Sequence, residues 1–504
     1  MAHPIMIQGT MSNAGKSLIV TGLCRIFKQD GYKVAPFKAQ NMALNSYITE
    51  EGLEMGRAQV VQAQACGIKP SVDMNPILLK PTTDMGSQVI INGEVIGDMR
   101  AMDYYKHKKE YIPAVRTAYE RLDREYDIIV IEGAGSPAEI NLKQDDIVNM
   151  GMAKLADSPV LLVGDIDRGG VFAQLIGTVM LLDEEERDRI KGLIINKFRG
   201  DKKILEPGLE MITEKCGKTV LGVVPYTDAD IEDEDSLSER LNTNWTAVGS
   251  DGNVRNIIDV AIIRFPKISN FTDFQSLGLE NTIKIRYVSK AGELGAPDLI
   301  ILPGTKNTIN DLKWLRESGL ETRILRLASQ DTLIFGICGG YQMLGEDITD
   351  SLGLEGNTKH IRGLGLLPVC TAFEPEKQRT QTRGSIKTLT GSYAPLSGRE
   401  VCGYEIHMGR TEYIDKSYNG AIKLADNVDG CCAGNVFGTY LHGIFDDEDF
   451  RSAFVKMCCD RKNIQYVAGN TMTYAEYKEQ QFDLLADVIR ANLDMKEVYK
   501  IIGI

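Results

Sequence analysis

The sequence predicts an α/β protein with two doubly wound domains, one in each half of the chain. Short apolar, β-branched runs alternate with helix-like stretches over the first 225 residues. A second series of such runs begins near residue 257, and an acidic and polar stretch separates the two series. The length of 504 residues accommodates two large α/β units or three domains of average size.

The strands expected in the first domain are mainly apolar runs without alternation of polar residues. They lie at residues 4–7, 33–37, 127–131, 160–163, 193–196 and 220–224. Uninterrupted apolar runs are typical of strands that a parallel sheet buries on both faces. Amphipathic segments such as 17–28 and 172–182 are expected to cover that sheet as helices. We therefore expect residues 1–226 to form the first domain.

The stretch 227–256 crowds carboxylates together without a continuous apolar face, which favours a solvated linker. The second domain is expected at residues 257–450, and residues 451–504 are expected to form a helical extension at the C-terminus. Strands of the second domain are expected at residues 257–263, 283–288, 299–302, 332–337 and 435–441.

The composition argues against several classes of protein. The net charge of −13 disfavours non-specific binding of nucleic acid. No apolar run reaches the roughly 18 residues that a membrane span needs, and the N-terminus leaves no room for a cleavable signal peptide. Ten cysteines are too sparse for a disulfide scaffold, and the pairs Cys431–Cys432 and Cys458–Cys459 favour structural thiols over a metal site. A reducing cytoplasm fits these features.

The first expected strand opens into a glycine-rich loop that ends in Gly15–Lys16–Ser17. Five residues separate Gly9 from Gly15, where the common phosphate-binding loop has four. A loop between a strand and a helix still directs backbone N–H groups and the positive helix end at phosphates. Lys16 is expected to reach the β- and γ-phosphates of ATP. Residues of the loop that are expected to bind the nucleotide are Thr10, Asn13, Ala14, Gly15, Lys16 and Ser17.

Two further positions are expected to complete this nucleotide site. The Ser17 hydroxyl and the carboxylate of Glu132, which stands at the end of a buried strand, predict a Mg²⁺ site. The alternative for Glu132 is a helix cap or an exposed turn. Asn196 and Lys197 follow another strand and are candidates for recognising the nucleotide base.

A second catalytic pattern lies about three hundred residues downstream, in the run from Gly336 to Gly340 around Cys338. Small residues on both sides permit the sharp strand-to-helix turn of a nucleophile elbow, and a helix N-terminus favours the thiolate. The backbone N–H groups of Gly304, Thr305 and Gly339 are the expected oxyanion donors. The alternative is a buried cysteine in a glycine-rich turn.

Five histidines are available as the base for this thiol. His3 and His107 lie outside the second domain, and His360 falls in an expected loop. His442 ends an expected strand, and strand ends of such sheets converge on the active edge. His442 is therefore the preferred base, and His407 is its rival.

Cys338 in its glycine-rich turn, together with Leu441–His442–Gly443, resembles the type 1 glutamine amidotransferases. Members of that family usually carry a glutamate two residues beyond the histidine, where this chain has Ile444. The departure resembles the cobalamin-pathway branch, which lacks the usual third triad member. The group that orients His442 is therefore open.

The N-terminal half resembles the dethiobiotin synthetase type of P-loop enzyme, which shares the five-residue spacing and a Glu-Gly-Ala-Gly strand end. Several long blocks narrow the resemblance to the cobyric acid synthase family. They are residues 40–46, 54–59, 73–81, 136–142 and 164–172, and the resemblance covers nearly the whole chain. It implies an ATP-binding amide synthetase domain fused to a glutamine amidotransferase domain.

The resemblance implies that ATP and glutamine drive amidation of the b, d, e and g carboxylates of adenosylcobyrinic acid a,c-diamide, which gives adenosylcobyric acid. The corrin would bring its own cobalt, so ATP and Mg²⁺ are the expected cofactors. Because the substrate is a polyanion, cations and amides in or next to the family blocks are candidate substrate ligands. These candidates are Lys38, Asn41, Asn45, Arg57, Lys80 and Arg168, together with Asp146 and its neighbour Asp145 for positioning substrate or metal.

Expected partners are these small molecules, with no nucleic acid and no membrane, and the sequence leaves a homo-oligomer open. Three alternatives differ in what they predict. A partitioning-type ATPase would have no need of a cysteine and histidine domain. An amidase acting on the a and c carboxylates would share both domains. A binding scaffold would tolerate Cys338→Ser.

Overall fold

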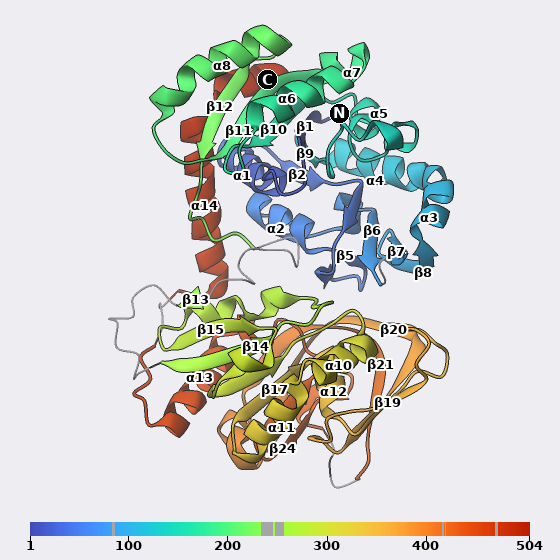
Figure 1. Cartoon of the computed structure of the whole chain (residues 1–504), viewed down its shortest axis with the longest axis vertical. Helices are drawn as coiled ribbons and strands as arrows, with labels where there is room; N and C mark the ends of the chain where they lie inside the picture. The colour runs from blue at the N-terminus through green and yellow to red at the C-terminus, as the bar shows by residue number, and fades with distance from the viewer. Residues whose placement is uncertain (83–85, 233–244, 247–256, 416–417, 419, 469–471) are drawn as a thin grey trace. The chain divides into compact units, whose positions relative to one another are not determined.

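The computed structural model describes residues 1–82, 86–232, 245–246, 257–415, 418, 420–468 and 472–504. Its contacts divide the chain into two compact units (Figure 1). The first unit comprises residues 1–43, 53–234 and 477–504, and the second comprises residues 44–52 and 235–476. Two segments, 44–52 and 477–504, thus belong to the unit that their place in the sequence does not suggest.

The first unit is built around a six-stranded parallel sheet with the order β12-β11-β10-β1-β9-β2. Its strands are β1 (His3–Gly9), β2 (Val34–Phe37), β9 (Ile128–Glu132), β10 (Val160–Asp165), β11 (Ile190–Phe198) and β12 (Val220–Pro225). The accompanying helices are α1 (Lys16–Gln29), α4 (Ile112–Glu125), α5 (Met150–Leu155), α6 (Val171–Leu181), α7 (Glu184–Arg189) and α8 (Lys202–Cys216). The doubly wound sheet that the apolar runs predict is confirmed.

A smaller sheet in the first unit takes two of its strands, β3 and β6, from the family blocks. It has the order β3-β6-β7-β8, formed by β3 (Gln40–Met42), β6 (Ile77–Pro81), β7 (Gly86–Ile91) and β8 (Glu94–Arg100). Nearby segments are β5 (Glu54–Gly56), α2 (Arg57–Cys66), the 3₁₀ turns Val72–Met74, Lys108–Tyr111 and Ile140–Asp145, and α3 (Ala101–His107). α2 packs against α1 and β2 of the large sheet, so its polar side chains are brought to the ends of that sheet.

The end of the chain returns to the first unit. α14 (Tyr474–Asn492) and α15 (Met495–Ile502) bury Phe482, Leu485 and Ile489 in the same apolar cluster as α1 and the large sheet (Figure 1). Gly22 of α1 permits this close approach, because a Cβ atom there would lie 2.2 Å from Ile489 Cδ1.

The second unit contains a seven-stranded sheet with the order β13-β15-β14-β16-β17-β25-β24. Its parallel strands are β14 (Ile258–Ile263), β15 (Ile283–Val288), β16 (Leu299–Leu302), β17 (Leu333–Ile337) and β25 (Val436–Thr439). The edge strands β13 (Trp245–Thr246) and β24 (Cys431–Ala433) run antiparallel. Its helices are α9 (Ala291–Leu294), α10 (Thr308–Glu317), α11 (Leu320–Ser329), α12 (Gly339–Leu344) and α13 (Glu448–Lys462).

A further sheet of the second unit is mainly antiparallel and contains two long paired strands, β20 (Val369–Ile386) and β21 (Glu400–Tyr413). Shorter strands complete it: β18 (Asp347–Thr349), β19 (His360–Arg362), β22 (Ile422–Leu424) and β23 (Val428–Asp429). The 3₁₀ turns are Phe271–Phe274, Ser276–Leu279, Gly391–Leu396 and Ile444–Asp446. The segment 44–52, which includes β4 (Ser46–Ile48), also belongs to this unit.

Most of the expected linker, at 233–244 and 247–256, lies outside the described residues. Its beginning is only partly solvated: Asp228 is exposed, but Glu232 is buried and accepts hydrogen bonds from Arg57 at 2.7 and 3.1 Å. Within the described part of the chain, no helix combines the length and apolar character that a membrane crossing requires.

Candidate active sites

The phosphate-binding loop connects β1 to α1, as the sequence predicts. Gly15 adopts a positive φ of 95° just before the helix, and Lys16 begins α1. Lys16 is 7% exposed, and its ammonium donates hydrogen bonds of 3.1 Å to the carbonyl oxygens of Met11 and Gly135. The Lys16 side chain therefore connects the loop after β1, through Met11, to the segment after β9, through Gly135.

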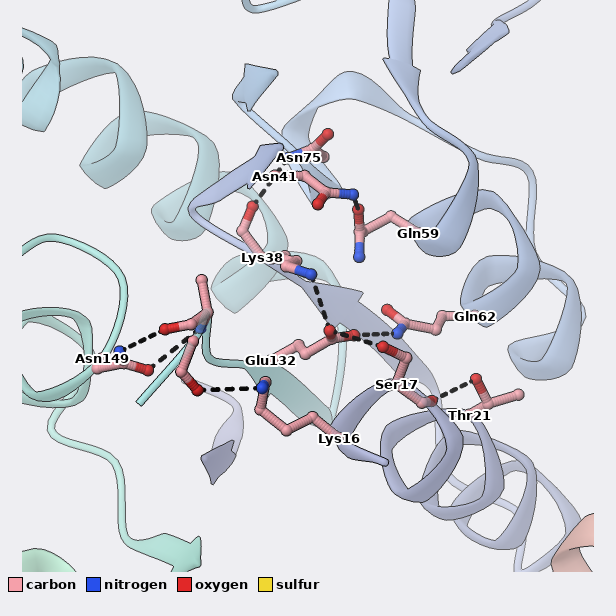
Figure 2. Close-up of polar contacts among 12 residues, drawn as sticks. Lys16, Ser17, Thr21, Lys38, Asn41, Gln59, Gln62, Asn75, Glu132 and Asn149 are labelled. Carbon is pink, nitrogen blue, oxygen red and sulfur yellow. Dashed lines mark hydrogen bonds and ion pairs between the residues drawn. The ribbon is translucent and has the colours of Figure 1, made fainter. Parts of the chain in front are cut away.

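The carboxylate of Glu132 is the centre of a buried polar cluster in the first unit (Figure 2). Its Oε1 accepts hydrogen bonds from Ser17 Oγ at 2.9 Å and from Lys38 Nζ at 2.8 Å. Its Oε2 accepts a hydrogen bond from the Gln62 amide, which comes from α2. The helix-cap and exposed-turn alternatives do not describe this residue, because Glu132 is 1% exposed and bonds three side chains.

The cluster has the oxygen donors that Mg²⁺ prefers. Ser17 Oγ and Glu132 Oε1 lie 2.9 Å apart at the start of α1, beside the loop expected to hold the phosphates. The ammonium of Lys38 bonds the same oxygen and balances the carboxylate. Across the described residues, three or more His, Cys, Asp or Glu side chains do not gather into a group that could hold a metal ion.

The expected base-recognition residues lie against the other side of the loop. Asn196 is fully buried, and its amide donates a 3.0 Å hydrogen bond to the Ala14 carbonyl. Lys197 Nζ donates to the Asn13 carbonyl at 2.8 Å and to Asp165 Oδ2 at 2.9 Å. Thr10 Oγ1 donates to Gln174 at 3.1 Å. These contacts connect the loop to β10, β11 and α6.

The candidate substrate ligands of the first unit are only partly brought together. Lys38 contacts Glu132, and Asn41 donates to Gln59 Oε1 at 3.0 Å on the same helix face as Gln62. Arg57 and Lys80 instead form buried ion pairs with Glu232 and Glu54.

The other candidates are spread along the chain. Asp146 accepts backbone N–H groups of residues 148, 149 and 151, and its neighbour Asp145 forms an ion pair with Lys109. Arg168 is exposed, and Asn45 is buried in the segment 44–52 of the second unit.

Cys338 stands on a strained turn between β17 and α12. Its φ of 51° and ψ of −110° are unfavourable for a residue with a side chain, which is the geometry of a nucleophile elbow. Gly340 is required next to it, because a Cβ atom there would lie 1.9 Å from the Leu302 carbonyl oxygen. The Cys338 N–H bonds the Thr439 carbonyl at 2.9 Å, and Sγ lies 3.7 Å from the Ile406 carbonyl oxygen.

His442 is paired with a carboxylate that the sequence analysis did not identify. Its Nδ1 lies 2.6 Å from Asp273 Oδ2, and Asp273 Oδ1 accepts the Gly443 N–H at 3.1 Å. Burial by itself lowers the pKa of His442, but the charge and hydrogen bond of Asp273, followed by those of Cys338, raise it to about 10. Asp273 therefore favours the protonated form of the His442 imidazole.

The expected oxyanion donors border this pair. A Cβ atom on Gly304 would lie 3.1 Å from His442 Cε1, and one on Gly339 would lie 3.1 Å from the Thr305 nitrogen. The Thr305 hydroxyl donates to Asp311, whose pKa burial raises to about 6. Gly304, Thr305 and Gly339 are thus gathered around the elbow and the imidazole.

The rival base, His407, has a different environment. Its Nδ1 lies 2.8 Å from the Gly409 carbonyl, and its ring stacks on Tyr440 with centroids 3.7 Å apart. Tyr440 in turn accepts a hydrogen bond from Gln342, the residue four positions after Cys338. His360 lies in β19 instead of a loop, and its Nε2 contacts Asp347 at 2.8 Å.

Family models match both halves of the chain. Residues 5–238 match the CobQ/CobB/MinD/ParA nucleotide binding domain, and residues 259–450 match the CobB/CobQ-like glutamine amidotransferase domain. The cobyric acid synthase of Lachnoclostridium phytofermentans is 58% identical over 518 residues, which cover 99% of each chain. The chain belongs to the cobyric acid synthase family.

Other members of the cobyric acid synthase family show the same end-to-end similarity. The Ruminiclostridium cellulolyticum protein is 55% identical over 100% of this chain and 97% of its own. The Streptococcus sanguinis protein is 48% identical over 100% of this chain and 99% of its own. The family that the sequence blocks predict is therefore confirmed over the full length.

Two residues at these sites, Asp273 and Gln62, are not identified by any motif in the sequence. Asp273 lies 169 positions before its partner His442, in a 3₁₀ turn with no catalytic pattern of its own. Gln62 lies on α2, beyond the family block 54–59, and no motif marks it. The sequence gives only an indirect indication of Asp273. Ile444 occupies the position of the usual glutamate, so a different residue must supply the carboxylate.

Proposed function

We propose that this chain catalyses the ATP- and glutamine-dependent amidation of the b, d, e and g carboxylates of adenosylcobyrinic acid a,c-diamide to adenosylcobyric acid. The observation that carries the proposal is the coexistence of Lys16, Ser17 and Glu132 with Cys338, His442 and Asp273 in a chain that matches cobyric acid synthases end to end. A cytoplasmic location stays a prediction.

In the glutamine half-reaction, the Cys338 thiol transfers its proton to His442, and Sγ attacks the side-chain amide carbon of glutamine. Backbone N–H groups of Gly304, Thr305 and Gly339 stabilise the oxyanion. His442 delivers a proton to the departing nitrogen, ammonia leaves, and a thioester remains on the sulfur. Water then hydrolyses the thioester to glutamate and regenerates the thiol. Asp273 keeps the ring oriented and stabilises its charged form.

In the ATP half-reaction, a corrin carboxylate attacks the γ-phosphorus of ATP, which forms an acyl phosphate and releases ADP. Lys16 neutralises charge on the transferring phosphoryl group. Ser17 and Glu132 would hold Mg²⁺, which supplies further neutralisation when bound. Ammonia then displaces phosphate from the acyl group and leaves the amide. Thr10, Asn13, Ala14, Gly15 and Asn196 shape the loop that holds the nucleotide.

Substrate binding is assigned first to Lys38 and Asn41. Lys38 is the cation nearest the Ser17 and Glu132 oxygens, and Asn41 is linked to Gln59 on the adjoining helix face. Arg57 and Lys80 would need to exchange carboxylate partners to bind substrate directly, so they are assigned a supporting role. Asn45, Asp146 and Arg168 stay predictions.

Mass analysis of a reaction with glutamine, ATP and adenosylcobyrinic acid a,c-diamide tests the proposal. Four successive carboxylate-to-amide conversions are expected, and Cys338→Ser should abolish them unless ammonia is added. Amidation of the a and c carboxylates of cobyrinic acid, with no reaction of the diamide, would identify the earlier-acting amidase instead. ATP turnover indifferent to both glutamine and corrin would identify an ATPase.

A further inference from the structure

We propose that Tyr404 is a positioning residue for His442, and that the segment 44–52 holds Tyr404 in place. The segment comes from the nucleotide-binding half of the sequence but packs in the unit that carries the thiol. The proposal rests on the glutamine hydrolysis assigned above and does not depend on which acid is amidated.

Tyr404 covers the catalytic imidazole. Its ring stacks on the ring of His442 with centroids 5.4 Å apart and planes inclined by 21°. The two backbones also exchange hydrogen bonds, with Tyr404 N donating to His442 O at 3.1 Å and His442 N donating to Tyr404 O at 2.9 Å. Tyr404 is 5% exposed and His442 is 1% exposed, so the phenol ring helps to exclude water from the imidazole.

Asn270 joins Tyr404 to the segment. Its Nδ2 donates to Tyr404 Oη at 3.3 Å, and its Oδ1 accepts the Ser46 N–H at 3.1 Å. The Tyr404 hydroxyl in turn donates to the Ser46 carbonyl at 3.3 Å. Asn270 immediately precedes the 3₁₀ turn that carries Asp273. The peptide groups of Ser46 therefore bond both Tyr404, which stacks on the imidazole, and the turn that supplies its carboxylate partner.

Apolar contacts reinforce the same arrangement. Ile48 is fully buried in a small cluster with Tyr404 and Ile406, and the Tyr47 ring meets Tyr404 edge-on with centroids 5.4 Å apart. Ile406 is the residue whose carbonyl oxygen lies 3.7 Å from Cys338 Sγ. One cluster thus contacts the base through Tyr404 and the nucleophile through Ile406.

The segment is continuous in the chain with the site around Glu132. Lys38 and Asn41 precede it, and Gln59 and Gln62 follow it. Each of these residues lies in the first unit, where Lys38 and Gln62 bond Glu132. A single loop between them therefore supplies the contacts that fix Tyr404, so the glutamine site is complete only when the nucleotide-binding half of the sequence is present.

The test compares full-length variants by glutamate release from glutamine and, separately, by ammonia-driven amidation. Tyr404→Phe removes the hydroxyl and keeps the ring, Tyr404→Leu removes the ring, and Tyr47→Leu removes the edge contact. Asn270→Gly removes both side-chain hydrogen bonds at a backbone with φ of 52°, which glycine tolerates. Tyr413→Phe is the matched control, because it deletes a hydroxyl bond to the Gly430 carbonyl at the other end of β21.

Loss of one such hydrogen bond corresponds to about a fivefold effect. We expect Tyr404→Phe, Asn270→Gly and Tyr47→Leu each to lower kcat for glutamine about fivefold with KM changed less than about twofold. Tyr404→Leu should lower kcat further, and ammonia-driven amidation should stay unchanged in all of them. The double variant of Tyr404→Phe and Asn270→Gly should lose less than the product of the single losses, because both remove the same contact.

Three results would overturn the proposal. They are kcat values for glutamine that match the Tyr413→Phe control, fully multiplicative losses in the double variant, or an equal fall in ammonia-driven amidation. The last would reveal a general loss of structure. If the chain hydrolyses glutamine but leaves the corrin diamide unreacted, the function proposed above fails while the glutamate readout still tests Tyr404.

Discussion

Replacing Asp273 with asparagine is expected to disable glutamine hydrolysis and to spare the ammonia-driven reaction. Asparagine has the same size and can still accept the Gly443 N–H, but its amide nitrogen would then face His442 Nδ1. Because an amide nitrogen only donates, Nδ1 would have to accept, and the ring proton would move to Nε2. The nitrogen left for proton exchange with Cys338 would then be unable to accept a proton.

The size of the effect follows from the electrostatics of the pair. The pKa of His442 rises from 6.5 to about 10 despite a burial contribution that lowers it. The difference corresponds to roughly 5 kcal/mol in favour of the imidazolium, at about 1.4 kcal/mol per pKa unit. Without the carboxylate, the two largest contributions that raise the pKa of His442 are lost, so this pKa should fall. A displaced general acid and base typically costs about 10²–10⁴ in rate, so kcat for glutamine should fall at least 10²-fold.

Steady-state glutamate release and ammonia-driven amidation are the two assays for Asp273→Asn. The same pair also predicts how stability depends on pH. Because the folded pKa is raised, the stabilising contribution is complete below pH 6.5 and is lost as the pH rises through about 10. Denaturant midpoints of the unchanged protein should therefore fall more steeply over this range than those of Asp273→Asn. Glutamine hydrolysis within tenfold of the unchanged protein would refute the role of Asp273.

Three other substitutions test the ATP site and the stability of the fold. Glu132→Gln should abolish ATP-driven amidation, even with ammonia supplied, and leave glutaminase activity in place, because it removes the carboxylate that Ser17 and Lys38 contact. Equal loss of both activities would contradict this expectation. Gly340→Ala should lower the free energy of unfolding by more than about 2 kcal/mol, since its Cβ atom would lie 1.9 Å from a backbone oxygen; an unchanged denaturant midpoint would contradict it. Glu280→Gln should destabilise the protein by about 3–5 kcal/mol, because Arg451 is 2% exposed and would keep an uncompensated charge. A loss of unfolding free energy below about 1 kcal/mol would show that another group balances the charge of Arg451.

Local patterns were sufficient for the central parts of both units. Strand β17 has no polar side chain and β9 is apolar up to Glu132 at its end, so their place in a buried parallel sheet follows from their own residues. The glycines around Cys338 and the loop before Lys16 specify turns whose geometry depends mainly on neighbouring residues in the sequence. For that reason the nucleophile and the phosphate loop could be located from the sequence alone.

Long-range contacts are the part that the sequence did not reveal. Asp273 meets His442 across 169 positions, and Arg57 meets Glu232 across 175, so no window of sequence contains either pair. The carboxylate of Glu232 belongs to an acidic run that reads as solvated, and its burial depends on a cation contributed by α2. Such pairings are decided by the packed fold, because burying either charge alone would be unfavourable.

Because residues 477–504 belong to the first unit, a fragment that ends near residue 238 lacks part of that unit. A fragment of residues 1–238 contains the whole nucleotide-binding match but lacks Phe482, Leu485 and Ile489, each at most 2% exposed in the core against α1. Burying three such side chains contributes roughly 5–9 kcal/mol, which is comparable to the whole stability of a typical domain. The fragment should therefore be recovered unfolded, and adding residues 472–504 as a separate peptide or a fusion should restore cooperative unfolding. A fragment of residues 1–238 that unfolds cooperatively by itself would show that the C-terminal helices only cover this core without stabilising it.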